Sequence, residues 1–333
     1  MTAILDINAL EGVIGMRDAI DLLEATLPHE AAGSTTVSPK FITDFDSGMI
    51  RILFAADRAS GYCAMKAYHN IKGVGTRYVV LLYRLEDGEL LATLDGRLIT
   101  DLRTGAASGV AARKVKIDGP VTVGIIGSGN QARTQLESLA SVYPVKAAYV
   151  FSPTEANRRS YAAEMSARLG FPVHPVGSVE EAVRGRQVVA SASNARTPEP
   201  ILRGAWLEGC RLLCAVGNTR AGFAEVDAQC FGDAGLVVVD SLHALKEAGD
   251  LKRAVEAGAL PESKQATLAQ LVEGKVAAPK TGLVTFKSVG TALQDLALAS
   301  RYYELLKDKP GIVHGPSAAT LRDHGRRNPH APR

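Results

Sequence analysis

Hydrophobic residues change their spacing along the 333-residue chain. Residues 16–31, MRDAIDLLEATLPHEA, carry apolar side chains at helical spacing, interrupted by Pro28. Over 35–95 the chain has short segments rich in β-branched and aromatic residues, separated by Asp-Gly and Ser-Gly turns. This pattern predicts adjacent strands in an antiparallel meander. Residues 100–115, TDLRTGAASGVAARKV, contain many small residues and no proline, which predicts a closely packed helix. Residues 117–120 are interpreted as a linker.

Beyond Pro120 apolar runs alternate with helical stretches. The runs are VTVGIIG, AAYVF, FPVHPV, QVVASAS, RLLCAVG and GLVVVD. Because crossover helices join parallel strands, this alternation predicts an α/β fold with a Rossmann-type, doubly wound parallel sheet. Near the end, TALQDLALASRYYELLK has the pattern of an amphipathic helix that crosses back to the first domain. Residues 313–333 show no periodicity and are expected to be mostly disordered.

Composition narrows the class of protein. Hydrophobic residues make up 46% of the chain and charged residues 22%, which suits a folded core with a polar surface. The net charge of +3 does not predict a nucleic-acid partner. The longest apolar runs are strand-sized, so no membrane span is expected, and the first residues lack the basic region of a signal peptide.

Cysteines and histidines point to no metal or disulfide framework. Cys63, Cys210, Cys214 and Cys230 have neither paired spacing nor zinc-ligand spacing, which predicts free thiols in a reducing cytoplasm. The histidines form no ligand cluster, so we predict that the protein holds no metal.

A glycine-rich turn joins the strand pattern and the helix pattern of VTVGIIGSGNQARTQLESLASV (121–142). It has the form G-x-G-x-x-A, in which the first glycine permits the tight turn and the second admits a pyrophosphate close to the backbone. The alanine keeps the helix near the sheet, and the free N–H groups of the first helical turn face the phosphates. The turn predicts dinucleotide binding, with an ordinary strand-to-helix loop as the alternative. The predicted contacts are Gly127, Ser128, Gly129, Asn130, Gln131 and Ala132.

The end of the next strand bears on the choice of coenzyme. An acid there would bind the ribose 2′-OH of NAD, but the chain has Ser152 in AAYVFSPTEANRR. Thr154, Arg158 and Arg159 follow, and a guanidinium matches a 2′-phosphate well. The pattern favours NADP(H), and NAD(H) stays possible because Glu155 could turn inward to the ribose. The alternative for the arginines is a solvated helix face.

Three motifs, RTGAASGVAARKV (103–115), IIGSGNQA (125–132) and FKSVGTALQDLALA (286–299), occur in the order of the ornithine cyclodeaminase and μ-crystallin family. The chain resembles that family over nearly its whole length except the tail. The resemblance implies a substrate-binding and dimerisation domain over 1–118, completed by about 292–312, and a Rossmann domain over 119–291. Members include cyclodeaminases, alanine dehydrogenases and imine reductases, so the resemblance alone does not select one activity.

The resemblance also implies basic side chains that bind a substrate carboxylate. Lys66 in AMKAY and Arg103 in LRTGAAS fall on matching positions, and Thr76 falls where similar enzymes place a hydroxyl near the substrate. Lys40 stands after Pro39, where the family has an arginine. This replacement keeps the positive charge but loses the planar, two-pronged donor.

The residue chemistry agrees with these roles. Arg103 is suited to clamp a carboxylate in two places and so to fix the carbon that exchanges hydride. Lys66 lies between apolar residues of a predicted strand, where partial desolvation would lower its pKa toward that of a proton donor or acceptor. The alternative for Arg103 is an ion pair with Asp101, and the alternative for Lys66 is a place on an edge strand with its side chain in solvent.

One departure from the family separates two activities. Ornithine cyclodeaminases carry an aspartate just after the strand that here reads CAVGNTRAG, and the matching residue is Thr219. A threonine cannot replace a carboxylate base, which ring-forming deamination needs. Reduction of a preformed imine needs only a carboxylate clamp, a cofactor and a proton donor, so Thr219 favours a reductase or a dehydrogenase.

Further strand ends are predicted to line the cofactor, because ligands of such folds bind at the carboxyl edge of the sheet. An Asn in such a place is otherwise a simple turn former. Asp240 is interpreted as the cap of the helix that follows it. The predicted cofactor contacts at these strand ends are Ser193, Asn194, Val216, Gly217, Asn218, Ser288, Val289 and Gly290.

The sequence thus predicts a cytoplasmic, homodimeric NAD(P)H-dependent oxidoreductase of the C–N bond. It would reduce a ketimine or a cyclic imine carboxylate, or run as an amino acid dehydrogenase. Two alternatives stay open: an ornithine cyclodeaminase-like lyase with bound NAD, and a crystallin-like cofactor-binding protein without turnover. A homodimer is expected because the meander's edges need covering.

Overall fold

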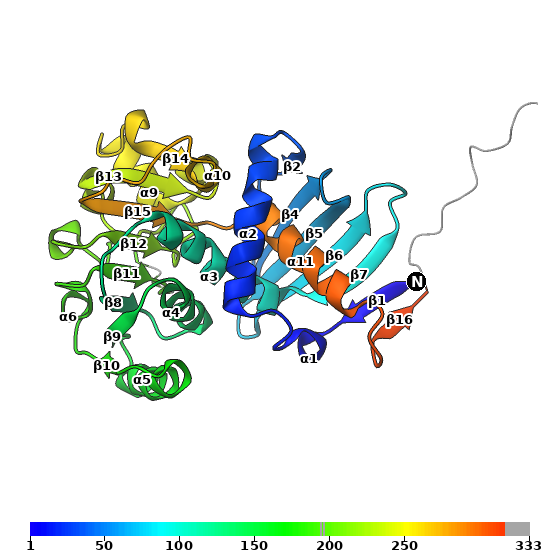
Figure 1. Ribbon diagram of the computed structural model, residues 1–333, viewed down its shortest axis with the longest axis horizontal. Helices are drawn as coiled ribbons and strands as arrows, with labels where there is room; N and C mark the ends of the chain where they lie inside the picture. Colours follow the sequence, from blue (N-terminus) through cyan, green and yellow to red (C-terminus); the bar gives the residue numbers. More distant parts are fainter. Residues whose placement is uncertain (194, 196, 317–333) are drawn as a thin grey trace, which may run out of the picture.

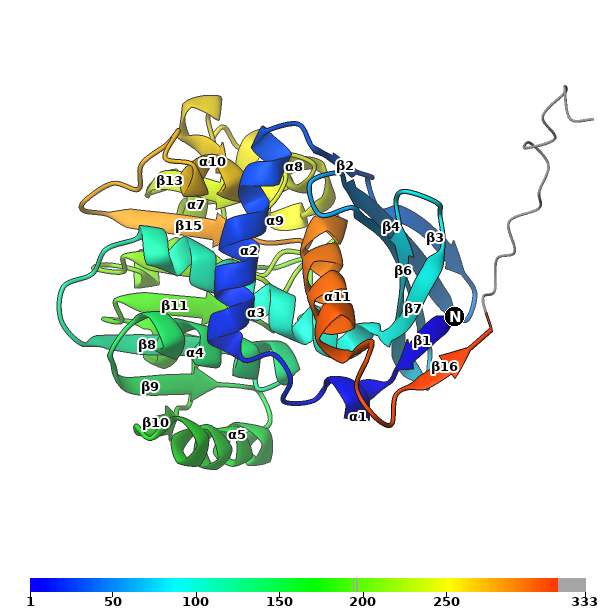
Figure 2. The same cartoon turned by 45° about the vertical axis from the view of Figure 1, so that its right-hand side comes forward.

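The computed structural model describes residues 1–193, 195 and 197–316. It has two lobes, each built on one β-sheet (Figures 1 and 2). The first lobe contains β1 (Thr2–Leu5), α1 (Ile7–Leu10), α2 (Met16–Ala31), β2 (Thr35–Val37), β3 (Phe41–Phe45), β4 (Gly48–Asp57), β5 (Tyr62–Ile71), β6 (Gly75–Arg84), β7 (Leu90–Asp95), α3 (Gly96–Lys114), α11 (Ala292–Leu306) and β16 (Val313–Gly315). The second contains β8 (Val121–Ile126), α4 (Asn130–Val142), β9 (Val145–Phe151), α5 (Glu155–Leu169), β10 (Val173–Pro175), α6 (Val179–Val183), β11 (Val188–Ser191), β12 (Leu212–Ala215), α7 (Gln229–Gly232), β13 (Ala234–Val239), α8 (Ala244–Glu247), α9 (Gly249–Glu256), β14 (Gln265–Thr267), α10 (Leu268–Val272) and β15 (Leu283–Lys287).

The first sheet has the predicted meander at its centre. Its order is β16-β1-β7-β6-β5-β4-β2, with β3 paired to β4, and β4 to β7 are antiparallel neighbours. Strand β1 joins β7 in parallel and β16 pairs with β1. The start of the tail, which we expected to be disordered, is therefore a strand at Val313–Gly315, because the edge of β1 offers it backbone partners. Residues 317–333 lie outside the described part of the chain.

The second sheet is parallel throughout, in the order β10-β9-β8-β11-β12-β15-β13-β14, which confirms the predicted doubly wound α/β class. Strand β15 (Leu283–Lys287) was missing from the predicted strands, although it lies between β12 and β13. The order reverses between β8 and β11, which is where ligands of such folds bind.

Two helices stand between the sheets. Helix α3 leaves the first sheet and packs against α4 of the second lobe, where Ser138 Oγ donates to the Gly105 carbonyl over 2.6 Å. The small residues of α3 permit this approach, as predicted. Helix α2 continues through Pro28 to Ala31. The predicted interruption there is wrong, because Pro28 lies in the last turn and removes only one backbone hydrogen bond.

Candidate active site

A buried carboxylate joins the two cations that the sequence singled out. Lys66 on β5 places Nζ 2.9 and 3.0 Å from the two carboxylate oxygens of Asp295 on α11. Arg103 on α3 places Nε 3.2 Å from Oδ1 of the same carboxylate. The exposed fractions are 2% for Lys66, 7% for Arg103 and 1% for Asp295. The alternative for Arg103, a pair with Asp101, does not form, since Asp101 accepts hydrogen bonds from Asn130 and Gln131.

These surroundings change the pKa of the Lys66 ammonium. Burial lowers its pKa to about 8, while Asp295 acts in the opposite direction and Arg103 adds to the lowering. Nζ also lies 5.6 and 5.7 Å from the ring centroids of Tyr68 and Tyr78, which are stacked on each other. A lysine with this pKa can give up or take a proton near neutral pH.

Arg51 is a buried cation that sequence reasoning missed. Its register partner is Tyr68, and its Nη1 lies 3.1 Å from the Tyr68 hydroxyl and 3.4 Å from Thr219 Oγ1. It is 5% exposed, its Nε has no hydrogen-bond partner, and none of the described carboxylates pairs with it. A signal was present in MIRILFA, where a lone arginine takes an inward position of an apolar strand.

A cavity of about 200 Å³ lies beside this cluster, between the two lobes. Both lobes supply its walls, and it contains most of the predicted substrate-binding residues. Thr76 is not among them, because it lies two residues farther out on β6 than Tyr78 and accepts a hydrogen bond from Asn70. The lining residues are Lys40, Leu53, Lys66, Tyr68, Tyr78, Thr100, Arg103, Thr104, Gln131, Val216, Gly217, Thr219, Ser288, Val289 and Gly290.

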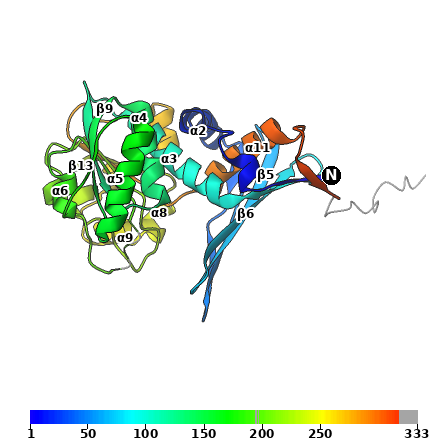
Figure 3. The same cartoon turned by 90° about the horizontal axis from the view of Figure 1, so that it is seen from below.

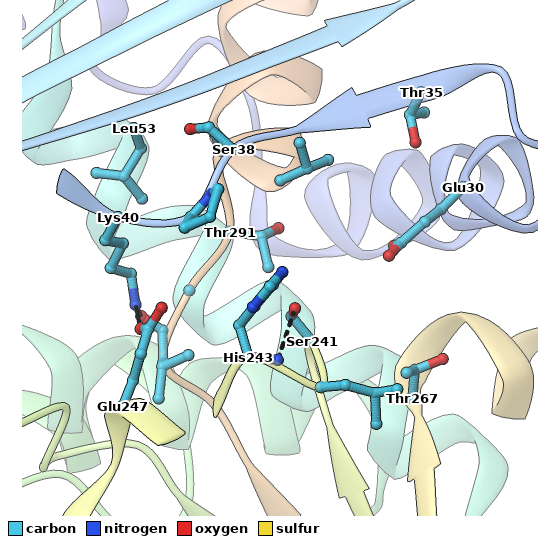
Figure 4. A pocket seen from close by; sticks show the side chains of 16 residues that line it. Glu30, Thr35, Ser38, Lys40, Leu53, Ser241, His243, Glu247, Thr267 and Thr291 are labelled. Atoms are coloured by element: carbon cyan, nitrogen blue, oxygen red, sulfur yellow. Dashed lines mark hydrogen bonds and ion pairs between the residues drawn. The ribbon is translucent and has the colours of Figure 1, made fainter. Parts of the chain in front are cut away.

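Lys40 links the two lobes at the edge of this cavity. Its Nζ lies 2.7 Å from Glu247 Oε2 and 2.7 Å from the Val289 carbonyl oxygen. Burial lowers the pKa of Lys40, and Glu247 counters that effect. Beyond the pair lies a second cavity of about 340 Å³, into which Glu30 and His243 point from opposite lobes (Figure 4).

The glycine-rich turn has the geometry that a dinucleotide requires. Gly127 has φ +112°, and a Cβ there would lie 2.5 Å from the Ala192 carbonyl oxygen. At Gly129, which precedes the first turn of α4, a Cβ would meet no protein atom within 4 Å, so the approach to the helix N-terminus is open. Ala132 is fully buried against the sheet. These features fit a pyrophosphate held by backbone N–H groups.

The end of β9 carries the predicted coenzyme determinants. Ser152 is 6% exposed, and its Oγ accepts a hydrogen bond from Ser128 Oγ over 2.9 Å. Arg158 Nη1 donates to the Ser152 carbonyl over 3.1 Å, so its guanidinium lies at this strand end. Arg159 instead pairs with Glu155 over 2.7 Å on the exposed face of α5. Thr154 caps α5 without a side-chain hydrogen bond.

A buried polar network holds the neighbouring strand ends together. Glu225 accepts hydrogen bonds from the backbone N–H groups of Ser193 (2.6 Å) and Gly217 (3.0 Å). Burial raises the pKa of Glu225, and Lys287 opposes the rise. Asp250 pairs with Lys287 over 2.7 Å, and Lys287 also donates to the Asn218 carbonyl over 2.7 Å. Sequence reasoning missed Glu225 and Asp250.

Asn194 and Asp240 were both assigned roles from the sequence. Asn194 lies outside the described residues. Asp240 does not cap a helix, because α8 begins only at Ala244 and the Asp240 carboxylate accepts hydrogen bonds from Ser288, Val289 and Gly290. Those donors lie in the turn that follows the adjacent strand β15, so the carboxylate bonds that turn and not the following helix.

Some other kinds of site are not found in the described part of the chain. No helix there is long and apolar enough to cross a membrane. No group of three or more His, Cys, Asp or Glu side chains among the described residues is placed to hold a metal. The cysteines are free thiols.

The Rossmann-type sheet, its open glycine-rich turn and the adjoining cation-rich cavity define the class of this protein, a nicotinamide-dinucleotide-dependent oxidoreductase. The chain belongs to the ornithine cyclodeaminase/mu-crystallin family, whose model matches residues 1–310. This confirms the predicted family.

Named relatives span reductases and a dehydrogenase. The chain is 31% identical to Delta(1)-pyrroline-2-carboxylate reductase of Bacillus cereus, over 68% of this chain and 70% of that protein. The structure of Thermococcus litoralis Delta(1)-pyrroline-2-carboxylate reductase in complex with NADH and L-proline is similar with a TM-score of 0.86 at 30% identity, covering 91% of this chain and 97% of that chain. An archaeal alanine dehydrogenase dimer with bound NAD has a TM-score of 0.85 at 27% identity, covering 94% and 99%.

Proposed function

We propose that this protein reduces the C=N bond of a small cyclic imine carboxylate to the corresponding amino acid. The relatives confirm the broader prediction, an NAD(P)-dependent oxidoreductase that acts on C–N bonds. The observation that carries the proposal is the buried Lys66–Asp295–Arg103 cluster at the wall of a cavity beside the Rossmann crevice. The reductases among the relatives support a cyclic substrate.

The cluster assigns a task to each side chain. Arg103, which lines the cavity, binds the substrate carboxylate, and Arg51, which lies behind the lining, holds Tyr68 and Thr219 in place. Lys66 uses two of its three N–H donors on Asp295, which leaves one for the substrate nitrogen. That proton completes the amine, and the nicotinamide, when bound, supplies the hydride. The stacked rings of Tyr68 and Tyr78 line the same cavity and give the substrate an aromatic wall.

The cavity wall favours reduction over the lyase alternative. No Asp or Glu is present among the described residues that line it, and Thr219 lies where a cyclodeaminase carries its aspartate. Asp250 and Glu225, the nearest acids beyond Asn218, are buried and engaged by backbone N–H groups. Asp295 is the other acid of the cluster, but it is 1% exposed and engaged by Lys66 and Arg103, so a ring-forming deamination lacks a free carboxylate base at the substrate.

The test is absorbance of the reduced nicotinamide. Purified protein is mixed with NADPH or NADH and with pyrroline-2-carboxylate, piperideine-2-carboxylate, or pyruvate plus methylamine. We expect oxidation of the coenzyme with the cyclic imines. No oxidation with any compound, together with formation of proline and ammonia from ornithine and NAD, would establish the lyase instead. No conversion of either kind would leave the crystallin-like alternative.

We propose NADPH as the preferred coenzyme, and this is supported by Arg158 at the end of β9 and by the outward pairing of Glu155. Replacing Arg158 with Ala is expected to weaken NADPH binding by about tenfold while NADH changes little, because a guanidinium–phosphate contact is lost. The matched control is Arg159→Ala, expected to affect both coenzymes equally. Titration calorimetry gives the dissociation constants of NADPH and NADH for both variants. If Arg158→Ala and Arg159→Ala weaken NADPH binding to the same extent, the assignment is contradicted.

A homodimer is proposed through a face of the first sheet, and not through its edges. The sheet is covered by α11 on one side and is bare on the other (Figure 3). The register places Phe41, Ile52 and Phe54 on the face opposite Leu53 and Lys66, and Phe41 and Phe54 are 63% and 37% exposed. Such an apolar face calls for a partner. Sedimentation is expected to return twice 35.2 kDa, and a single 35.2 kDa species refutes the dimer.

A cytoplasmic location stays a prediction.

A further inference from the structure

Asp240 is a buried carboxylate that the proposed reaction does not use. It directly follows β13, and the pairing of Val239 with Lys287 sets it beside the point where the chain leaves β15. It is 2% exposed and is not among the residues that line either cavity. A role as acid or base toward a substrate is therefore excluded by its position.

One oxygen of Asp240 fixes three consecutive residues. Oδ2 accepts hydrogen bonds from Ser288 Oγ (2.7 Å), the Val289 N–H (3.0 Å) and the Gly290 N–H (2.6 Å). Hydrogen bonds to an ionised acceptor are the strong ones, and successive N–H groups aimed at one anion form a nest. The other oxygen, Oδ1, has no partner. The carboxylate is thus committed to the turn between β15 and α11.

That turn touches two of the cations at the cavity. Gly290 has φ +77°, and a Cβ on it would collide with the guanidinium of Arg103, so the backbone packs directly on that group. The Val289 carbonyl accepts the hydrogen bond of Lys40 Nζ over 2.7 Å. The Val289 residue is therefore held from both sides, its N–H by Asp240 and its carbonyl by Lys40.

We propose that Asp240 is a positioning residue for the substrate carboxylate. By fixing the turn at 288–290 it sets the location of the Arg103 guanidinium and the Lys40 ammonium. The proposal rests on the proposed function, in which Arg103 binds the substrate carboxylate, and it adds Lys40, which lines the same cavity. Glu225 is the counterpart on the cofactor side, because it holds the strand ends at Ser193 and Gly217 by the same kind of bond.

The two carboxylates make a matched pair of variants. Asp240→Asn is expected to raise KM for the cyclic imine, and the Kd of pyrrole-2-carboxylate measured with NADPH present, by about tenfold, which is the size of a hydrogen bond to a charged group. Its Kd for NADPH alone is expected to stay within about threefold of the wild type. Glu225→Gln is expected to show the reverse split. A purely structural role would weaken both ligands together and lower Tm.

Each outcome decides the proposal. Equal weakening of both ligands by Asp240→Asn, or no change in either, overturns it. If Asp240→Asn does not fold, Asp240→Glu keeps the charge and displaces the carboxylate by one methylene, and is expected to raise the Kd of pyrrole-2-carboxylate by about threefold with the Kd of NADPH unchanged. An unchanged Kd there also overturns it. If the wild type reduces no imine, the proposed function fails, while the pyrrole-2-carboxylate titration still tests Asp240.

Discussion

Replacing Asp295 with Asn is expected to remove most activity at pH 7 and about 3–5 kcal/mol of unfolding free energy, the usual cost of breaking a buried ion pair. Asp295 is the shared partner of Lys66 and Arg103, and the three side chains are nearly inaccessible to water. Without the carboxylate, two positive charges remain buried next to each other. The loss of stability should shrink as the pH rises toward 8, because the pKa of Lys66 in the variant lies below the wild-type value of about 8 and its proton is released in that range.

The same substitution should move the pH profile. Burial lowers the pKa of Lys66 to about 8 even with Asp295 present, and Asp295 raises it. In Asp295→Asn the pKa of Lys66 falls further, so the alkaline limb of imine reduction should begin at a lower pH than in the wild type. A limb that stays in place would show that another group titrates there.

Urea unfolding and initial rates between pH 6 and pH 10 give both quantities. Asp87→Asn is the matched control, because Asp87 pairs with Arg84 over 2.8 Å at the surface. Surface ion pairs add little to stability, so this variant should unfold like the wild type and keep its rate profile. Equal losses in the two variants would mean that the buried cluster has no special role.

Local patterns in the sequence were enough to predict much of the site. Lys66 interrupts an apolar strand, Arg103 opens a run of small residues, and the glycine-rich turn at Gly127 follows a strand and begins a helix. Each of these signals is complete within a short segment. The strand and helix rhythm beyond Pro120 is equally local, which is why the parallel sheet was predicted.

The partners of these residues depend on long-range packing. Asp295 lay within the quoted motif FKSVGTALQDLALA, yet nothing near it in the chain says that it meets a lysine 229 positions earlier. The available signal was that Asp295 is the charged residue in the first two turns of α11, where residues 292–299 are all buried. The prediction for Asp240 was wrong because two kinds of aspartate look alike in sequence. One caps the helix that follows it, and the other accepts hydrogen bonds from the turn after a neighbouring strand. Strand order, which places β15 between β12 and β13, is likewise absent from local periodicity.

Replacing Lys66 with Met is expected to lower the rate of imine reduction by about 10²–10⁴-fold, the usual contribution of a positioned general acid. Methionine fills a similar volume without a proton to give, so NADPH binding should stay within about threefold.

The pH dependence identifies the ionisation. With the pKa of Lys66 at about 8, the protonated form needed for reduction is present below pH 8 and disappears as the pH rises through that value. Amino acid oxidation needs the neutral form and should rise over the same range. In Lys66→Met the residual rates of imine reduction and of amino acid oxidation should no longer change with pH near 8. The control Lys246→Met replaces an exposed lysine on α8 and should keep both pH dependences. A residual rate that still titrates near pH 8 would assign the proton to another group, and the Lys66–Asp295 pair would then serve only to hold Arg103 in place.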